Sequence, residues 1–101
     1  MTPKHYAYGH FGLDDDRKFD SSCGINYIDD QHKMLAALSV VADDFCNTQV
    51  ARLNGVVAPE TLQDHANKWA SLKATLRANL DMPFQQIATP DGRVFWWCKL
   101  V

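Results

Sequence analysis

The sequence predicts an α+β domain in which a helical hairpin packs on a small antiparallel sheet, with the elements in the order β-αα-ββ. Two neighbouring segments between residues 28 and 83 repeat apolar residues at helical spacing. An aromatic segment precedes them, and two short apolar runs separated by a turn sequence follow them. A chain of 101 residues is about as long as one ordinary domain, so we expect residues 1–101 to form a single domain.

The first expected strand covers residues 5–11, with the sequence His-Tyr-Ala-Tyr-Gly-His-Phe. Aromatic residues interleaved with small ones favour a strand over a helix. Residues 12–24 are polar and contain three consecutive aspartates at residues 14–16. Because this run lacks the alternating ligands and the terminal Glu of a calcium loop, we expect a surface loop there.

Two segments carry the apolar stripe of an amphipathic helix. In the first segment the stripe consists of Met34, Leu35, Leu38, Val41, Ala42 and Phe45. In the second segment it consists of Leu62, His65, Trp69, Leu72, Leu76 and Leu80, and Pro83 ends it. Two adjacent amphipathic helices predict an αα-hairpin.

The sequence also indicates where these helices begin and end. Asn26, with one of the two aspartates at residues 29–30, supplies the acceptors that the first helix start needs. The first helix ends either near residues 47–48 or at residues 54–55. The later end is favoured because the Asn-Gly pair there readily takes the left-handed conformation. Pro59, followed by an acidic residue, suits the first turn of the second helix.

Residues 84–101 predict a β-hairpin. Residues 84–88 and 93–101 form the strands, and the sequence Thr-Pro-Asp-Gly at residues 89–92 connects them. Proline is favoured at the second position of a type I turn and glycine at the fourth.

Both faces of the last predicted strand are largely apolar. One face holds Val94, Trp96, Cys98 and Leu100, and the other holds Phe95, Trp97, Lys99 and Val101. One face should pack on the helices. We expect the other, containing Phe95 and Trp97, to bind a protein partner or a second copy in a homodimer, together with Tyr6 and Tyr8 of the first strand. The alternative is that the N-terminal aromatic segment or the polar loop covers this face.

Composition and charge exclude several classes of function. The net charge is −2 and the basic residues are scattered, so we expect no binding of nucleic acid. No segment reaches the roughly 18 apolar residues of a membrane span, and the N-terminus does not resemble a signal peptide, so we expect a cytoplasmic protein that does not bind membranes. Three widely spaced cysteines, Cys23, Cys46 and Cys98, predict reduced thiols.

Residues 23–35, with the sequence Cys-Gly-Ile-Asn-Tyr-Ile-Asp-Asp-Gln-His-Lys-Met-Leu, resemble the first-helix signature of bacterial hemerythrins. In that family a turn ending in Gly-Ile or Gly-Val is followed by Ile-Asp-x-Gln-His-Lys. Its members are four-helix bundles that hold two irons with histidines and carboxylates and bind dioxygen. The resemblance implies that His32 is an iron ligand, with His65 and Asp29 as further candidates.

The match covers residues 24–35, and the rest of the family pattern is absent. Trp69 stands where the second helix of the family carries a glutamate, and no histidine follows His65. If the helices reverse direction near residues 55–58, the level opposite His65 falls near Gln49, about 25 Å from His32 at 1.5 Å rise per residue.

No phosphate-binding loop, nucleophile elbow or H-E-x-x-H motif is present. We therefore expect a non-enzymatic accessory protein without a cofactor, of the kind that phages and mobile elements use as inhibitors, which binds a protein or self-associates. One alternative is a degenerate hemerythrin-like module that binds iron. Another is a small-molecule pocket lined by Trp69, Trp96 and Trp97.

Overall fold

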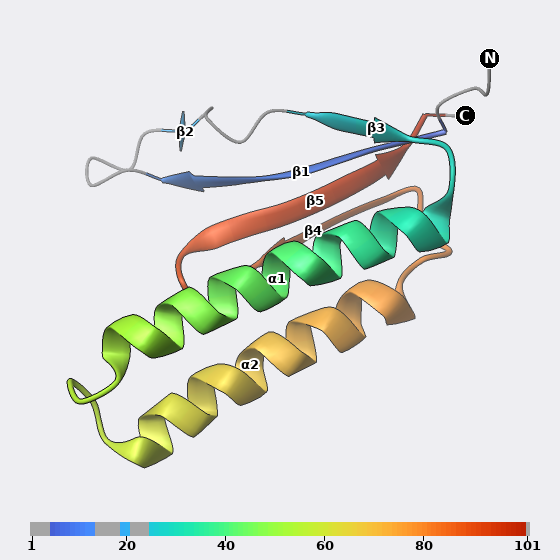
Figure 1. The fold of residues 1–101 in the computed structure, drawn as a ribbon. Helices are drawn as coiled ribbons and strands as arrows, with labels where there is room; N and C mark the ends of the chain where they lie inside the picture. The colour runs from blue at the N-terminus through green and yellow to red at the C-terminus, as the bar shows by residue number, and fades with distance from the viewer. Residues whose placement is uncertain (1–4, 14–18, 21–24, 101) are drawn as a thin grey trace.

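A computed structural model of the chain describes residues 5–13, 19–20 and 25–100. Two helices lie on one side of an antiparallel sheet (Figure 1), which confirms the predicted α+β class and the order β-αα-ββ. The elements are β1 (Tyr6–Leu13), β2 (Phe19–Asp20), β3 (Asn26–Ile28), α1 (Gln31–Leu53), α2 (Pro59–Ala78), β4 (Phe84–Ala88) and β5 (Arg93–Lys99). Of the helices described, neither combines the length and apolarity needed to cross a membrane.

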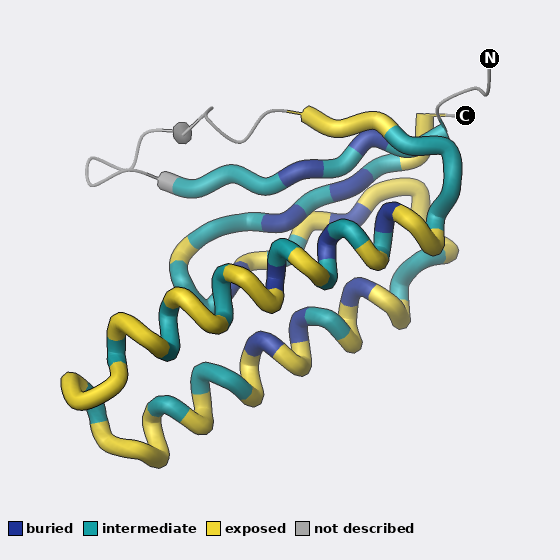
Figure 2. Tube along the Cα trace, in the orientation of Figure 1, coloured by how far each residue is buried: buried dark blue, intermediate teal, exposed yellow. Residues whose placement is uncertain are grey.

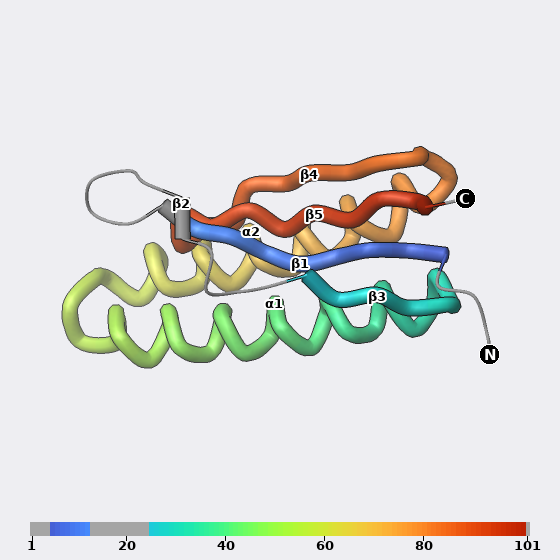
Figure 3. The backbone as a smooth tube through the Cα atoms, turned by 90° about the horizontal axis from the view of Figure 1, so that it is seen from above, coloured from blue at the N-terminus to red at the C-terminus, as the bar shows by residue number. Residues whose placement is uncertain are grey.

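The sheet is built around the pairing of its first and last strands. Its order is β2-β1-β5-β4, and β3 also pairs with β1. The β1–β5 register runs from Tyr6 opposite Lys99 to Gly12 opposite Arg93. Seen from above, β4 forms one outer edge of the sheet (Figure 3).

Helix α1 begins and ends at features that the sequence indicated. The side chain of Asp30 caps it by accepting a hydrogen bond of 3.0 Å from the backbone N–H of Lys33. The helix ends at Leu53, and Gly55 takes a positive φ of 81°. The backbone N–H groups of Val56 and Val57 both donate to the carbonyl of Leu53. The later of the two predicted ends is therefore confirmed.

Helix α2 begins at Pro59 as predicted but ends at Ala78, well before Pro83. The side chain of Gln31 donates to the carbonyl of Leu80, which ties the segment after α2 to the start of α1. Leu80 therefore packs against the core from outside the helix.

The segment predicted as a loop contains more strand than expected. Gly12 and Leu13 extend β1, and residues 19–20 form β2. Asn26 was predicted at a helix start and instead lies in β3, where it pairs with Tyr8. The remainder of this loop prediction, residues 14–18 and 21–24 including Cys23, lies outside the described residues.

The core lies between the helices and the sheet (Figure 2). Both helical stripes supply it, because each turns its apolar side toward β5. Its fully buried members are Met34, Leu38, Ala42, Trp69, Leu72, Leu76, Phe95 and Trp97. The turn between β4 and β5 forms at residues 89–92 as predicted, with Gly92 at a φ of 86° and its N–H donating to the carbonyl of Thr89.

Candidate functional site

The helices cover the face of β5 that holds Phe95 and Trp97. The exposed fraction of both side chains is 0%. The ring centroid of Phe95 lies 5.8 Å from that of Phe45 in α1 and 6.3 Å from that of Trp69 in α2. The prediction that these two residues form a partner-binding patch is therefore wrong.

Tyr6 and Tyr8 lie on the same helix-covered face. They pair with Lys99 and Trp97 respectively, and directly opposite residues of an antiparallel pair share a face. Both tyrosines are partly buried against the core, and the ring of Tyr6 makes an edge contact with that of Trp97. All four predicted partner-binding residues thus help to hold the fold together.

Two glutamines explain why the helices cover this face. The indole N–H of Trp97 donates to the side-chain oxygen of Gln85 at 2.8 Å, and the Gln85 amide donates to the carbonyl of Thr75 in α2 at 3.2 Å. A buried indole N–H needs such an acceptor. This bridge joins β5, β4 and α2, and sequence reasoning missed it.

The second bridge has the same chemistry. The indole N–H of Trp69 donates to Gln49 in α1 at 2.8 Å, and Gln49 donates to the carbonyl of Pro90 in the β4–β5 turn at 3.2 Å. Together the two bridges fix both helices against one face of the sheet.

The opposite face of the sheet, which we call the uncovered face, is also apolar. Strand registers place ten residues on it: Ala7, Gly9, Phe11, Tyr27, Phe84, Gln86, Ala88, Val94, Trp96 and Cys98. Gln86 is the one strongly polar side chain in this set. None of the ten carries a charge.

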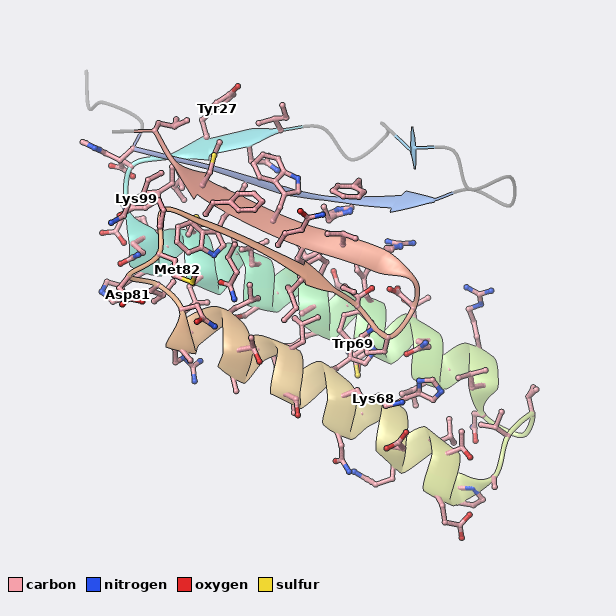
Figure 4. All side chains as sticks on the ribbon, turned by 180° about the vertical axis from the view of Figure 1, so that it is seen from behind. Tyr27, Lys68, Trp69, Asp81, Met82 and Lys99 are labelled. Carbon is pink, nitrogen blue, oxygen red and sulfur yellow. The ribbon has the colours of Figure 1, made fainter. Side chains whose placement is uncertain are left out.

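Several side chains of the uncovered face are open to solvent. The exposed fraction is 57% for Tyr27 and 49% for Phe84, and Leu100, just after β5, reaches 47%. Figure 4 shows Tyr27 pointing away from the helices. Among the elements described, both helices lie on the other side of the sheet, so neither covers this face (Figure 1). Ala7 and Gly9 of this face are buried, and Phe11, Val94, Trp96 and Cys98 are half-buried. Exposed aromatic side chains beside them are typical of an interaction site.

The structure brings two of the three predicted metal ligands together and places the third, His65, elsewhere. Asp29 and His32 line an open depression of about 470 Å³ near the start of α1, together with His5 and Lys99. Trp69 of α2 bonds to Gln49, which lies about 25 Å along α1 from His32 at 1.5 Å rise per residue. His65 precedes Trp69 by four residues on the antiparallel α2, so it lies one helical turn further still from His32. In the described part of the chain, no three His, Cys, Asp or Glu side chains gather in a way that could hold a metal ion.

His65 instead lies partly buried on the inner side of α2. Its Nδ1 is buried and makes no hydrogen bond within residues 5–13, 19–20 and 25–100.

The alternative of a tryptophan-lined pocket is wrong. Trp69 and Trp97 are both in the core, with exposed fractions of 1% and 0%, whereas Trp96 lies on the other face of the sheet. The described cysteines are free thiols. Burial raises the pKa of the Cys46 thiol above its ordinary value, which disfavours the thiolate that a nucleophile needs.

No family model, curated protein or solved structure matches the chain. The fold defines a two-layer α+β domain with helices on one face of the sheet and an apolar second face. The uncovered face is its candidate functional site.

Proposed function

We propose that the chain is a protein-interaction module that binds its partner through the uncovered face. The observation that carries this proposal is a sheet that is apolar on both faces with helices on only one. Antiparallel sheets with one solvated face normally alternate apolar and polar residues along each strand. Here β5 places Val94, Trp96 and Cys98 on the face away from the helices.

The composition of the face favours a protein partner with an apolar surface. Its aromatic members are Phe11, Tyr27, Phe84 and Trp96. Aromatic residues are enriched at the centres of protein interfaces, where a few of them carry most of the binding energy. The absence of basic residues from the set disfavours nucleic acid as the partner.

In this proposal the chain is a cytoplasmic accessory protein that acts without a cofactor. It changes its partner's behaviour by occupying the partner's surface, as inhibitors do. Trp96 lies in the middle of the face, between Gly9 of β1 and Gln86 of β4, and is the expected centre of the contact.

Site-specific photo-crosslinking in the native cells tests the proposal. A photoreactive phenylalanine analogue replaces Tyr27 or Phe84 on the uncovered face. The control replaces Val40, which is 62% exposed on α1. We expect positions 27 and 84 to crosslink to one defined protein that is not a second copy of the chain, and position 40 to crosslink to none. If position 40 gives the same species, or if positions 27 and 84 give none, the proposal is wrong.

A further inference from the structure

Strand β4 forms an open edge of the sheet. Within the described ranges it pairs with β5 alone. Exposed edges are usually protected by charged side chains, prolines or bulges. The β4 sequence Phe-Gln-Gln-Ile-Ala contains no charge or proline, and its register with β5 runs unbroken over all five residues. This edge therefore retains the capacity to pair with another strand.

The hydrogen bonds to β5 determine which groups of β4 point outward. The N–H of Lys99 donates to the carbonyl of Pro83, and the N–H of Thr89 donates to the carbonyl of Arg93, both at 2.8 Å. In an antiparallel ladder every second residue bonds to the neighbouring strand, so residues 83, 85, 87 and 89 bond to β5. Phe84, Gln86 and Ala88 consequently direct their backbone N–H and C=O groups toward solvent.

We propose that β4 pairs with β4 of a second copy, in antiparallel orientation, around a two-fold axis at Gln86. In this register Gln86 lies opposite Gln86 of the second copy, and Phe84 lies opposite Ala88. Each outward backbone N–H and C=O group of β4 then has a hydrogen-bond partner on the second copy. At each end of the paired strands the large side chain of Phe84 lies beside the small one of Ala88. A two-fold axis through a single residue is the simplest closed arrangement for an open edge.

The charges at the two ends of β4 fit this arrangement. Asp81 precedes the strand, and Lys68 of α2 lines a depression with Ala88, Thr89 and Pro90 at its far end. Figure 4 shows Asp81 and Lys68 toward opposite ends of β4. Antiparallel pairing brings Asp81 of each copy toward Lys68 of the other. Both side chains are exposed, and Lys68 makes an ion pair of 3.1 Å with Asp64 on its own helix. A surface ion pair of this kind is weak, so a second acidic side chain can replace Asp64 as its partner.

The same axis places both helical layers on one side of the joined sheet. The two uncovered faces then form one continuous surface that points away from the helices. The edge pairing itself does not rest on the proposed function, because its hydrogen bonds are made by backbone groups of β4.

Sedimentation equilibrium with charge variants at position 86 tests the dimer. Gln86→Lys and Gln86→Glu each set like charges against each other on the axis, so each should weaken dimerisation about fivefold. An equimolar mixture of the two should restore the affinity, because only the mixed pair has opposite charges. Gln86→Thr, a neutral strand former, is the matched control and should still dimerise. The Gln86 side chain is exposed, so all three should keep the wild-type melting temperature at protein concentrations low enough for the wild type to be monomeric.

Three results would overturn the inference. The first is a wild-type chain that stays monomeric at every concentration. The second is a dimer that both charged variants leave intact, which would exclude an axis at this residue. The third is a mixture that remains monomeric. Trp96→Ser separates the two proposals: we expect it to abolish partner crosslinking and to leave the β4 dimer intact.

Discussion

The side chains on the two faces of strand β5 differ in how deeply they are buried. Phe95 and Trp97 of β5 are completely buried under the helices, whereas Trp96, between them, lies half-buried on the uncovered face. Both sides carry large apolar residues. The difference lies in the neighbours, because Gln85 accepts from the indole N–H of Trp97 and is itself held by α2. Burial in such a strand is therefore decided by tertiary contacts.

The largest expected effect is a contrast in stability between the two tryptophans. Trp97→Ala should lower the free energy of unfolding by about 3–5 kcal/mol, because it leaves a cavity in the core. Trp96→Ala should cost about 1 kcal/mol, since less apolar area leaves contact with protein. Chemical denaturation of both variants measures the difference. Equal losses would mean that the two faces are equally packed.

A smaller contrast is expected between two neighbouring glutamines of β4. Gln85→Leu should lower the free energy of unfolding by about 1–3 kcal/mol, because it leaves the buried indole N–H of Trp97 without an acceptor. Gln86→Leu, on the uncovered face, is the control and should leave that free energy nearly unchanged. Thermal denaturation at low protein concentration compares them, and a similar loss in both would show that the bridge to Thr75 is unimportant.

The cap of α1 predicts a modest, pH-dependent effect. The hydrogen bond from the Lys33 backbone N–H lowers the pKa of Asp30 below its ordinary value of 3.8. A carboxyl group whose pKa is lowered by folding stabilises the fold above its ordinary pKa, and this contribution is lost as the pH falls through the lowered value. Asp30→Ala should therefore lower the melting temperature by a few degrees at pH 7.

Asp30→Asn serves as the control for this prediction, because asparagine also caps helices well. It should retain most of the melting temperature at pH 7. Melting curves recorded from pH 7 to pH 2 should show the Ala variant and the wild type converging in acid. A difference that stays constant with pH would assign the effect to something other than the carboxylate.

The smallest expected effect concerns the hemerythrin-like segment. Because His32 and His65 lie far apart, we expect untagged protein purified without chelator to carry no stoichiometric iron. His32→Ala should leave the melting temperature unchanged, since this side chain is exposed. Elemental analysis and a visible absorption spectrum measure the iron. Stoichiometric iron would require the helices to pack in a different register, and it would support the alternative of a hemerythrin-like module that binds iron.

The sequence was most informative where structure is local. The helical stripes, the Asn54-Gly55 turn, the proline at the start of α2 and the turn at residues 89–92 all depend on residues close in sequence. Strand β3 was missed because Asn26, Tyr27 and Ile28 show no alternation and owe their conformation to pairing with β1.

The candidate site was predicted only in outline. The pattern of residues 93–101 correctly indicated two apolar faces. It could not indicate which face the helices would cover, since Phe95 and Trp96 are equally suited to a core. The glutamines of β4 do not separate the two tryptophans either, because Gln85 lies opposite Trp97 and Gln86 lies opposite Trp96.

The pairing of β1 with β5 also has a consequence for how the protein is made. These two strands lie at opposite ends of the described chain, yet they form the centre of the sheet. During synthesis the helical hairpin can form early, but β1 finds its main neighbour only after residues 93–99 have left the ribosome. The final step of folding is therefore a late and long-range closure. A nascent chain stopped before β5 can pair β1 with β2 and β3, but it leaves β4 without the strand that joins it to the sheet.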